Sequence, residues 1–357
     1  MKNRMELFEN APVWKAYFTI SLPVVFSMVV TLVYNMVDTF FVAGTQNASL
    51  VAGVSQCTPL FMLMLALGDI FGLGGSSLIS RLFGQKDDET ARNVSGFCFY
   101  AAIVCGLIVT VLMFAVQGPV LRVLGATSDT LKYASQYYFW IALGAPLIIL
   151  SLTPSNIIRT EGLAMQSMIA SVAGSILNIV LDPIFIFTLG MGAGGAALAT
   201  VLGYVLSDVL LVCYILRKSR HLTVSIRHAR VARKFVTSVF VIGIPASLTN
   251  LMQSYNIMVL NRHLISYGPK AVAAMGITMK VNMIIMMILV GFAFGAQPLI
   301  GYAYGAGNRS RLRAVIRFDL LVEVGFSAVA SVVVIVLAPQ LIGMFMNDAS
   351  VVSYGTG

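Results

Sequence analysis

Long apolar runs separated by short polar stretches dominate the pattern along the chain. About 20 apolar residues are enough for an α-helix to cross the hydrocarbon core of a membrane, and these runs reach or exceed that length. Only helices and closed barrels satisfy the backbone in lipid, and the runs lack the alternation of barrel strands. The pattern therefore predicts about nine transmembrane helices, at residues 16–41, 51–79, 93–117, 133–152, 164–188, 194–216, 235–260, 271–297 and 314–338.

The composition agrees with an all-α polytopic membrane protein. Hydrophobic residues make up 58% of the 357 residues and charged residues only 10%, against about 25% charged residues in soluble domains. The first 15 residues are polar and the first apolar run has full spanning length, so we expect no cleavable signal peptide. The four cysteines lack paired spacing and the three histidines are scattered, so we predict no metal centre and no bound cofactor.

Basic residues are concentrated on one side of the predicted spans. With a cytoplasmic N-terminus, eighteen of the 23 Lys and Arg residues fall on the cytoplasmic side, seven of them in Arg217–Lys234, and four fall on the opposite side. This positive-inside pattern predicts that the N-terminus and the 217–234 segment are cytoplasmic. The net charge of +9 then reflects topology, and we predict no nucleic-acid partner. We expect 217–234 to be a solvated connector, with binding to anionic lipid as the alternative.

An internal repeat relates the two parts of the chain. Landmarks at Pro23, Tyr34, Val51, Gly84 and Gly118 recur at Pro245, Tyr255, Val272, Gly305 and Ala338, with offsets of 220 to 222. The repeat predicts a six-helix N-terminal lobe at 1–216, a connector at 217–234 and a C-terminal lobe at 235–357, in parallel orientation. Three more helices, between about 355 and 437, would complete a twelve-helix protein. A nine-helix protein with an external C-terminus is the alternative.

Two polar side chains share one face of the fifth predicted span. Asn178 and Asp182 are four residues apart, so they lie one turn above the other on a helix. Pro183 donates no backbone hydrogen bond, which leaves the carbonyl of Ile179 free in the same turn. An ionised aspartate at this depth costs about 2.5–3.5 kcal/mol even on a lenient scale, so it normally faces a cavity or a partner. We predict a cation or proton site, with a polar clamp between helices as the alternative.

Five stretches of the chain carry a resemblance to a known family. They are Asp38-Thr-Phe-Phe-Val-Ala-Gly, Ser80-Arg-Leu-Phe-Gly-Gln, Asn178-Ile-Val-Leu-Asp-Pro, Leu189-Gly-Met-Gly-Ala-Gly-Gly-Ala-Ala-Leu-Ala-Thr and Gln297-Pro-Leu-Ile-Gly-Tyr-Ala-Tyr-Gly-Ala. The chain resembles the multidrug and toxic compound extrusion (MATE) family of secondary transporters, and the last stretch resembles its bacterial drug-efflux branch. The resemblance implies two six-helix lobes around a central chamber and transport driven by proton or sodium entry.

The resemblance also implies a cation site in the first lobe. One branch of the family uses an Asp on helix one, an Asn and an Asp on helix five, and a Thr on helix six. Their counterparts here are Asp38, Asn178, Asp182 and Thr200. Another branch uses an acid on helix seven, and its position here is Gln253, so that acid is absent. This difference favours the first-lobe site.

Two coupling ions suit this predicted site. Two carboxylates in one low-dielectric chamber repel each other, so we expect Asp38 or Asp182 to hold a proton near neutral pH. The amide and hydroxyl oxygens of Asn178 and Thr200 would equally complete a shell for sodium, the only metal ion that we expect. Occupation of the site is predicted to change how the first span packs, with the kink at Pro23 as its soft point.

Other side chains are candidates for the chamber wall. A lysine inside a membrane needs a partner or a water-filled chamber, so Lys280 fits either a chamber role or a static ion pair. Flexible thioethers suit a wall that accepts varied apolar drugs, although core or lipid-facing packing is the alternative. The residues predicted to line the chamber are Tyr34, Asn35, Gln253, Lys280, Met283 and Met287. Four further acids at or near membrane depth have no assigned role: Asp69, Asp208, Asp319 and Glu323.

These features favour a secondary antiporter over three other classes. A flippase for a lipid-linked sugar would need several basic residues in the chamber, whereas acids predominate in these spans. An enzyme would need a catalytic constellation, and the sequence has no HExxH motif and no metal-spaced His or Cys group. A channel is disfavoured by the duplicated lobes. We therefore predict a monomeric antiporter of the bacterial inner membrane, surrounded by lipid, that exports amphipathic or cationic compounds in exchange for H⁺ or Na⁺.

Overall fold

The computed structural model describes residues 3–264 and 269–345, and it describes side-chain environments for 6–249, for Met252 and for 278–337. Within these ranges the regular structure is helical throughout. The elements are α1 (Asn3–Glu9), α2 (Val13–Gly44), α3 (Ala48–Gly84), α4 (Asp88–Ala115), α5 (Gln117–Val123), α6 (Leu131–Arg159), α7 (Ala164–Pro183), η1 (Ile184–Thr188), α8 (Gly192–Lys218), η2 (Ile226–His228), α9 (Arg233–Leu264), α10 (Pro269–Gly305) and α11 (Arg309–Phe345).

Eight helices in the described part of the chain are long and apolar enough to cross a membrane, namely α2, α3, α4, α6, α7 with η1, α8, α10 and α11. This confirms the prediction of an all-α polytopic membrane protein. The seventh predicted span, 235–260, falls within α9, much of which lies outside the described side chains. The helices extend past the predicted spans because polar residues cap them beyond the apolar core. The Asn47 side chain accepts from Leu50 N at 3.1 Å, and that of Asp87 accepts from Thr90 N at 3.1 Å.

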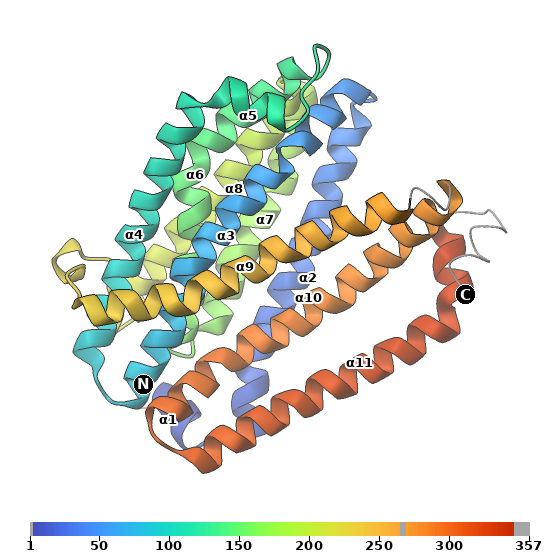
Figure 1. Ribbon diagram of the computed structural model, residues 1–357. Helices are drawn as coiled ribbons and strands as arrows, with labels where there is room; N and C mark the ends of the chain where they lie inside the picture. Colours follow the sequence, from blue (N-terminus) through green and yellow to red (C-terminus); the bar gives the residue numbers. More distant parts are fainter. Residues whose placement is uncertain (1–2, 265–268, 346–357) are drawn as a thin grey trace.

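An N-terminal bundle, formed by α2, α3, α4, α6, α7 and α8, is the best-packed part of the molecule (Figure 1). Helix α6 lies at the centre of this bundle, between α3, α4 and α8, and 78% of its most apolar 18-residue stretch is buried. The remaining long helices, α9, α10 and α11, cross this bundle at an angle. Contact between the two groups runs mainly through α3 against α9 and α10, and through α2 against α10.

Glycines allow these helices to approach until their backbones touch. At the crossing of α3 and α10, a Cβ on Gly84 would meet the backbone of Tyr302 and Ala306, and a Cβ on Gly305 would meet the backbone of Arg81. The sequence repeat pairs Gly84 with Gly305, so the repeat places its matched glycines against each other. Helix α3 also touches α9 closely at Gly74, and α10 touches α2 closely at Gly295. These two glycines are likewise 221 residues apart, so the repeat matches them as well.

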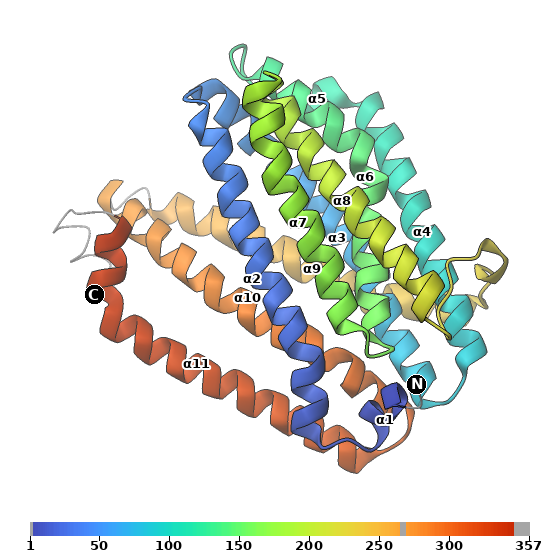
Figure 2. The same ribbon diagram turned by 180° about the vertical axis from the view of Figure 1, so that it is seen from behind.

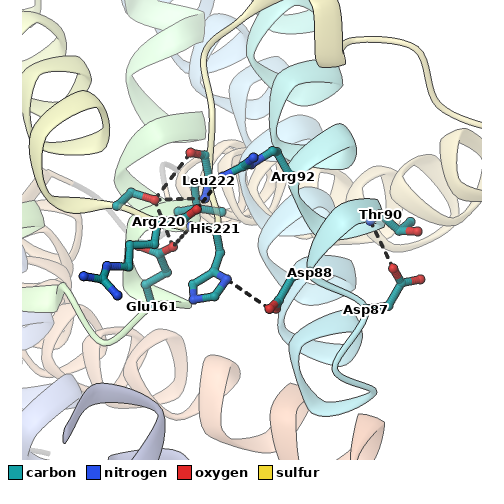
Figure 3. Close-up of polar contacts among 9 residues, drawn as sticks. Asp87, Asp88, Thr90, Arg92, Glu161, Arg220, His221 and Leu222 are labelled. Carbon is teal, nitrogen blue, oxygen red and sulfur yellow. Dashed lines mark hydrogen bonds and ion pairs between the residues drawn. The ribbon is translucent and has the colours of Figure 1, made fainter. Parts of the chain in front are cut away.

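The connector between α8 and α9 is fastened to the N-terminal bundle (Figure 3). Glu161, in the turn between α6 and α7, accepts hydrogen bonds from Ser219 Oγ and His221 N, both at 2.9 Å. His221 Nδ1 lies 3.1 Å from Asp88 Oδ2, and the Arg92 guanidinium donates to the Arg220 carbonyl. Because Glu161 itself is only 5% exposed, the connector is packed against the bundle rather than fully solvated.

Replacing Glu161 with alanine is expected to loosen this connector. The change leaves two donors without their acceptor, which typically costs about 1–3 kcal/mol when the groups are shielded from water. Trypsin digestion of the detergent-solubilised protein should then cut after Arg220 or Arg227 faster than in the parent chain. Glu89→Ala, which removes an exposed acid at the start of α4, is the matched control and should leave the digestion rate unchanged. Equal rates in the two variants would contradict a role for Glu161 in holding the connector.

Candidate cation site

The four residues predicted to bind a cation lie together on α2, α7 and α8, which are neighbours in the N-terminal bundle (Figure 2). Asp182 is completely buried, Asn178 is 1% exposed and Thr200 is 4% exposed. Asp38, on α2, is partly buried. The Asn178 amide donates to Thr200 Oγ1 at 3.3 Å and so joins α7 to α8.

The end of α7 is irregular where it carries Asp182. Pro183 is the last residue of α7, and the chain continues as the π-helical turn η1. Because a proline lacks an N–H, the Ile179 carbonyl loses its helical donor next to Asp182. Turns of this wider type occur often at functional sites, because they redirect side chains and free backbone carbonyls.

The carboxyl groups of Asp38 and Asp182 interact directly across the interface between α2 and α7. They are close enough to share a hydrogen bond when one of them carries a proton. When both carboxyl groups are ionised, three of their oxygens have no hydrogen-bond donor among the described residues, namely both oxygens of Asp182 and Oδ1 of Asp38. Asn178 Oδ1 is also buried without a donor in that part of the chain.

These four oxygens define the chemistry of the site. Buried acceptors without donors are costly, and an unpaired buried carboxylate is the costliest of them. A proton removes that cost, and so does a hard cation such as Na⁺, which takes carboxylate, amide and hydroxyl oxygens as ligands. The donor set of Asp38, Asn178, Asp182 and Thr200 therefore fits either ion.

Tyrosines complete the site, and sequence reasoning found only one of them. The Tyr34 hydroxyl lies near the side chains of Thr200 and Asp38. Tyr137, on α6, lies near both Asp38 and Asp182, and Tyr204, on α8, lies near Tyr34 and Tyr137. The sequence could have indicated Tyr204, because this residue stands four residues after Thr200 and so lies on the same helix face. Tyr137 carried no such signal, since only the packing of α6 brings it to the site.

The other residues predicted to line a chamber are spread more widely. Asn35 is exposed on α2. Lys280, Met283 and Met287 lie on α10, which packs against α2 and α3. The side chain of Gln253 lies outside the described residues. The predicted kink residue, Pro23, is buried within α2.

The remaining intramembrane acids include two with fixed polar partners. Asp69 faces the buried Arg159, whose guanidinium also donates to Ser155, Asn156 and Ser167 at 3.1–3.2 Å. Arg159, which the topology count placed in a cytoplasmic segment, is only 5% exposed at the end of α6. Asp319 accepts a hydrogen bond from the Tyr17 hydroxyl at 2.8 Å, and Glu323 lies one turn further along α11. These contacts join helices, whereas the oxygens of Asp182 and of Asp208 on α8 are buried without a hydrogen-bond partner among the described residues.

Comparison with known proteins gives consistent matches over almost the whole chain. The MatE family model matches residues 23–184 and again 245–357, so it is found twice in succession. The multidrug export protein MepA of Staphylococcus saprophyticus is 32% identical over 349 residues, which cover 98% of this chain and 77% of that protein. The two matched segments begin at Pro23 and Pro245, which the predicted repeat also pairs.

Solved structures share the fold at similar identity. An outward-facing multidrug resistance MATE family transporter of the MOP superfamily is 30% identical, with a TM-score of 0.89 over 99% of this chain and 78% of that one. A MOP superfamily transporter from Pyrococcus furiosus, described as having a binding pocket of reversed polarity and a different function, is 29% identical, with a TM-score of 0.90 over 99% of this chain and 78% of that one. From the twofold family match, the relatives and the helical membrane fold, we conclude that the chain belongs to the MatE family, the MATE family of bacterial membrane transporters.

Proposed function

We propose that the chain is a secondary antiporter that exports organic cations or other amphipathic compounds in exchange for H⁺ or Na⁺. The observation that carries this proposal is the set of four buried oxygens without donors at Asp38, Asn178 and Asp182. Such a set is stable only with a proton or a cation bound, so its state follows the ion gradient. The relative named as a multidrug export protein supports drugs as the exported cargo.

The proposed coupling uses the position of the site between α2 and its neighbours. Asp38 belongs to α2, whereas Asp182 and Thr200 belong to α7 and α8. Neutralising the pair removes the repulsion between α2 and α7, and ionising it restores that repulsion. Because α2 also packs against α10, a change in its packing reaches the C-terminal helices. Pro23, with its missing hydrogen bond to the preceding turn, is the point at which α2 bends most readily.

The same proposal includes the domain organisation and the orientation. We assign 1–216 to an N-terminal lobe, 217–234 to a connector on the cytoplasmic side and 235–357 to a C-terminal lobe. The protein acts as a monomer. Its two lobes rearrange so that the space between them opens alternately to the inside and to the outside of the membrane. The orientation rests on the excess of basic residues on the connector side, and the lobes rest on the repeat.

A lipid-linked sugar flippase is the rival within the same superfamily, and charge argues against it. Such cargo carries phosphates, which need a cluster of basic residues in the chamber. Arg159 is buried, but Asp69 and three neutral side chains surround it. The charged side chains within the spans of α2, α7 and α8 are the acids Asp38, Asp182 and Asp208, which suits a cationic cargo, and Lys280 on the neighbouring α10 is a single basic residue and not a cluster.

Efflux of a fluorescent organic cation from cells that express the protein tests the proposed function. A protonophore should abolish efflux if the coupling ion is H⁺, and removal of external sodium should abolish it if the ion is Na⁺. Cells that carry the empty vector provide the baseline. Efflux above that baseline that survives the loss of both gradients would contradict an antiporter, and so would an absence of efflux above the baseline while both gradients are intact.

A further inference from the structure

Asp208 is a buried carboxyl group that the proposed cation site does not include. It lies on α8, eight residues after Thr200, which is about 12 Å along a helix and close to the same face. Its side chain is 4% exposed, and neither carboxylate oxygen has a hydrogen-bond donor among the described residues. Asp208 therefore has the same unsatisfied chemistry as Asp182, displaced towards the connector end of α8.

Tyr204 stands midway between Thr200 and Asp208 on α8. Its hydroxyl interacts electrostatically with Asp208 on one side and with Tyr34 and Tyr137 on the other. Tyr34 lies near Thr200, and Tyr137 lies near the Asp38–Asp182 pair. Tyrosine hydroxyls therefore lie in the region between the cation site and Asp208, although no described hydrogen bond joins them to Asp208.

Among the side chains that the structure describes, none forms an ion pair with Asp208. The helices that pack against α8 are α2, α3, α6 and α7 with η1. Within the predicted spans, their titratable or charged groups are Tyr17, Tyr34 and Asp38, Cys57 and Asp69, Tyr133, Tyr137 and Tyr138, and Asp182, and Arg81 and Arg159 stand just beyond the spans of α3 and α6. The two arginines lie elsewhere: Arg159 is held by Asp69 and its serine and asparagine partners, and Arg81 lies over the Tyr304 ring.

A proton satisfies Asp208 better than a metal ion does. No group of three or more metal-ligating side chains occurs in the part of the chain that the structure describes. A hard cation needs several oxygen ligands, whereas a proton needs one carboxylate. An ionised carboxylate buried without a partner is strongly disfavoured, so the neutral acid is the stable form.

We propose that Asp208 is a second proton site of the N-terminal lobe, which exchanges protons with the Asp38–Asp182 pair through the Tyr204 hydroxyl. The inference rests on the proposed function with H⁺ as the coupling ion. In each transfer, Tyr204 passes its proton to the Asp208 carboxylate across a bridging water, because no described donor contacts Asp208 directly, and it receives one from the pair through Tyr34, Tyr137 or water. The pair loses one proton, Asp208 gains one, and no electrons change hands.

This relay gives the site a route towards the connector end of the bundle. Asp182 is completely buried, so a proton on it reaches water only when the lobes open or through neighbouring groups that accept and pass it on. The closest further acceptor along α8 is Asp208. A relay of hydroxyl and carboxyl groups supplies such a path without opening the lobe to water.

The test combines infrared spectroscopy with transport. In the purified protein, Asp208→Asn should remove one protonated-carboxyl band that remains in Asp182→Asn and in the control Ser207→Ala. In proteoliposomes with an imposed proton gradient, Asp208→Asn and Tyr204→Phe should slow efflux of a fluorescent organic cation at least about tenfold, since positioned proton transfer typically contributes 10²–10⁴-fold. The affinity for that cation should stay unchanged, which a merely structural defect would not preserve.

Two results would overturn the relay. One is an unchanged carboxyl spectrum in Asp208→Asn, because Asp208 would then be ionised in the parent protein. The other is normal efflux in Asp208→Asn when Asp182→Asn is inactive, which rejects the relay and leaves the proposed function intact. Efflux that persists in Asp182→Asn rejects the proposed function instead. If Asp208→Asn does not fold, Tyr204→Phe decides, since it removes only the hydroxyl.

Discussion

Replacing Asp182 with asparagine is expected to abolish gradient-driven efflux while the protein still folds. Asparagine has nearly the same shape as aspartate, and its amide donates a hydrogen bond to Asp38, so packing between α7 and α2 is kept. It carries no exchangeable charge, so the site no longer changes state with the ion gradient. We expect a loss of at least about a hundredfold, because proton transfer by a positioned group typically contributes that much. Proteoliposome efflux of a fluorescent organic cation measures it.

The companion variants make this prediction specific to the pair. Asp38→Asn should cause a similar loss, and the double variant should lose little more than either single one, because the two carboxyl groups act as a unit. Asp319→Asn is the matched control: it changes an intramembrane acid on α11, and its amide oxygen still accepts the hydrogen bond from Tyr17. Retained efflux in Asp182→Asn, or an equal loss in Asp319→Asn, would contradict a coupling role for the pair.

The sequence predicted the helices well because lipid leaves few alternatives to the backbone. The lengths of the apolar runs located the spans, but they indicated only the part of each helix that lies in the hydrocarbon core of the membrane. The span predicted at 51–79 is a helix from Ala48 to Gly84, because the helix continues into polar residues at both ends. Counting charges assigned Arg159 to a side of the membrane but said nothing of its surroundings: the structure buries it at the end of α6, where it donates to Ser155 and Ser167.

The site was predictable where its residues share one helix and was missed where they do not. Asn178 and Asp182 were placed on one face by their spacing, and the resemblance added Asp38 and Thr200. Tyr137 belongs to another helix, and no periodic pattern tells which side of α6 faces Asp38. The connector was likewise underestimated, because its hydrogen bonds to Glu161 depend on how α6 and α7 end in space.

Replacing Gly305 with valine is expected to destabilise the molecule at the crossing of α3 and α10. A Cβ at this position would lie against the backbone of Arg81, which has no flexible end that can move aside. Overpacking inside a well-packed core typically costs about 1–3 kcal/mol, and a clash with backbone lies at the upper end of that range. The midpoint of thermal unfolding in detergent should fall, and so should efflux, because the two helices can no longer approach.

Gly325→Val separates this effect from the general effect of adding a side chain. Gly325 lies on α11 with nothing within 4 Å of its Cβ position, and valine disfavours a helix less than glycine does. This variant should unfold at or above the parent temperature. Gly84→Val should behave like Gly305→Val, because the repeat pairs the two glycines and each touches the other's helix backbone. If all three variants unfold alike, α3 and α10 are not in backbone contact, and the repeat does not place its matched glycines at one crossing.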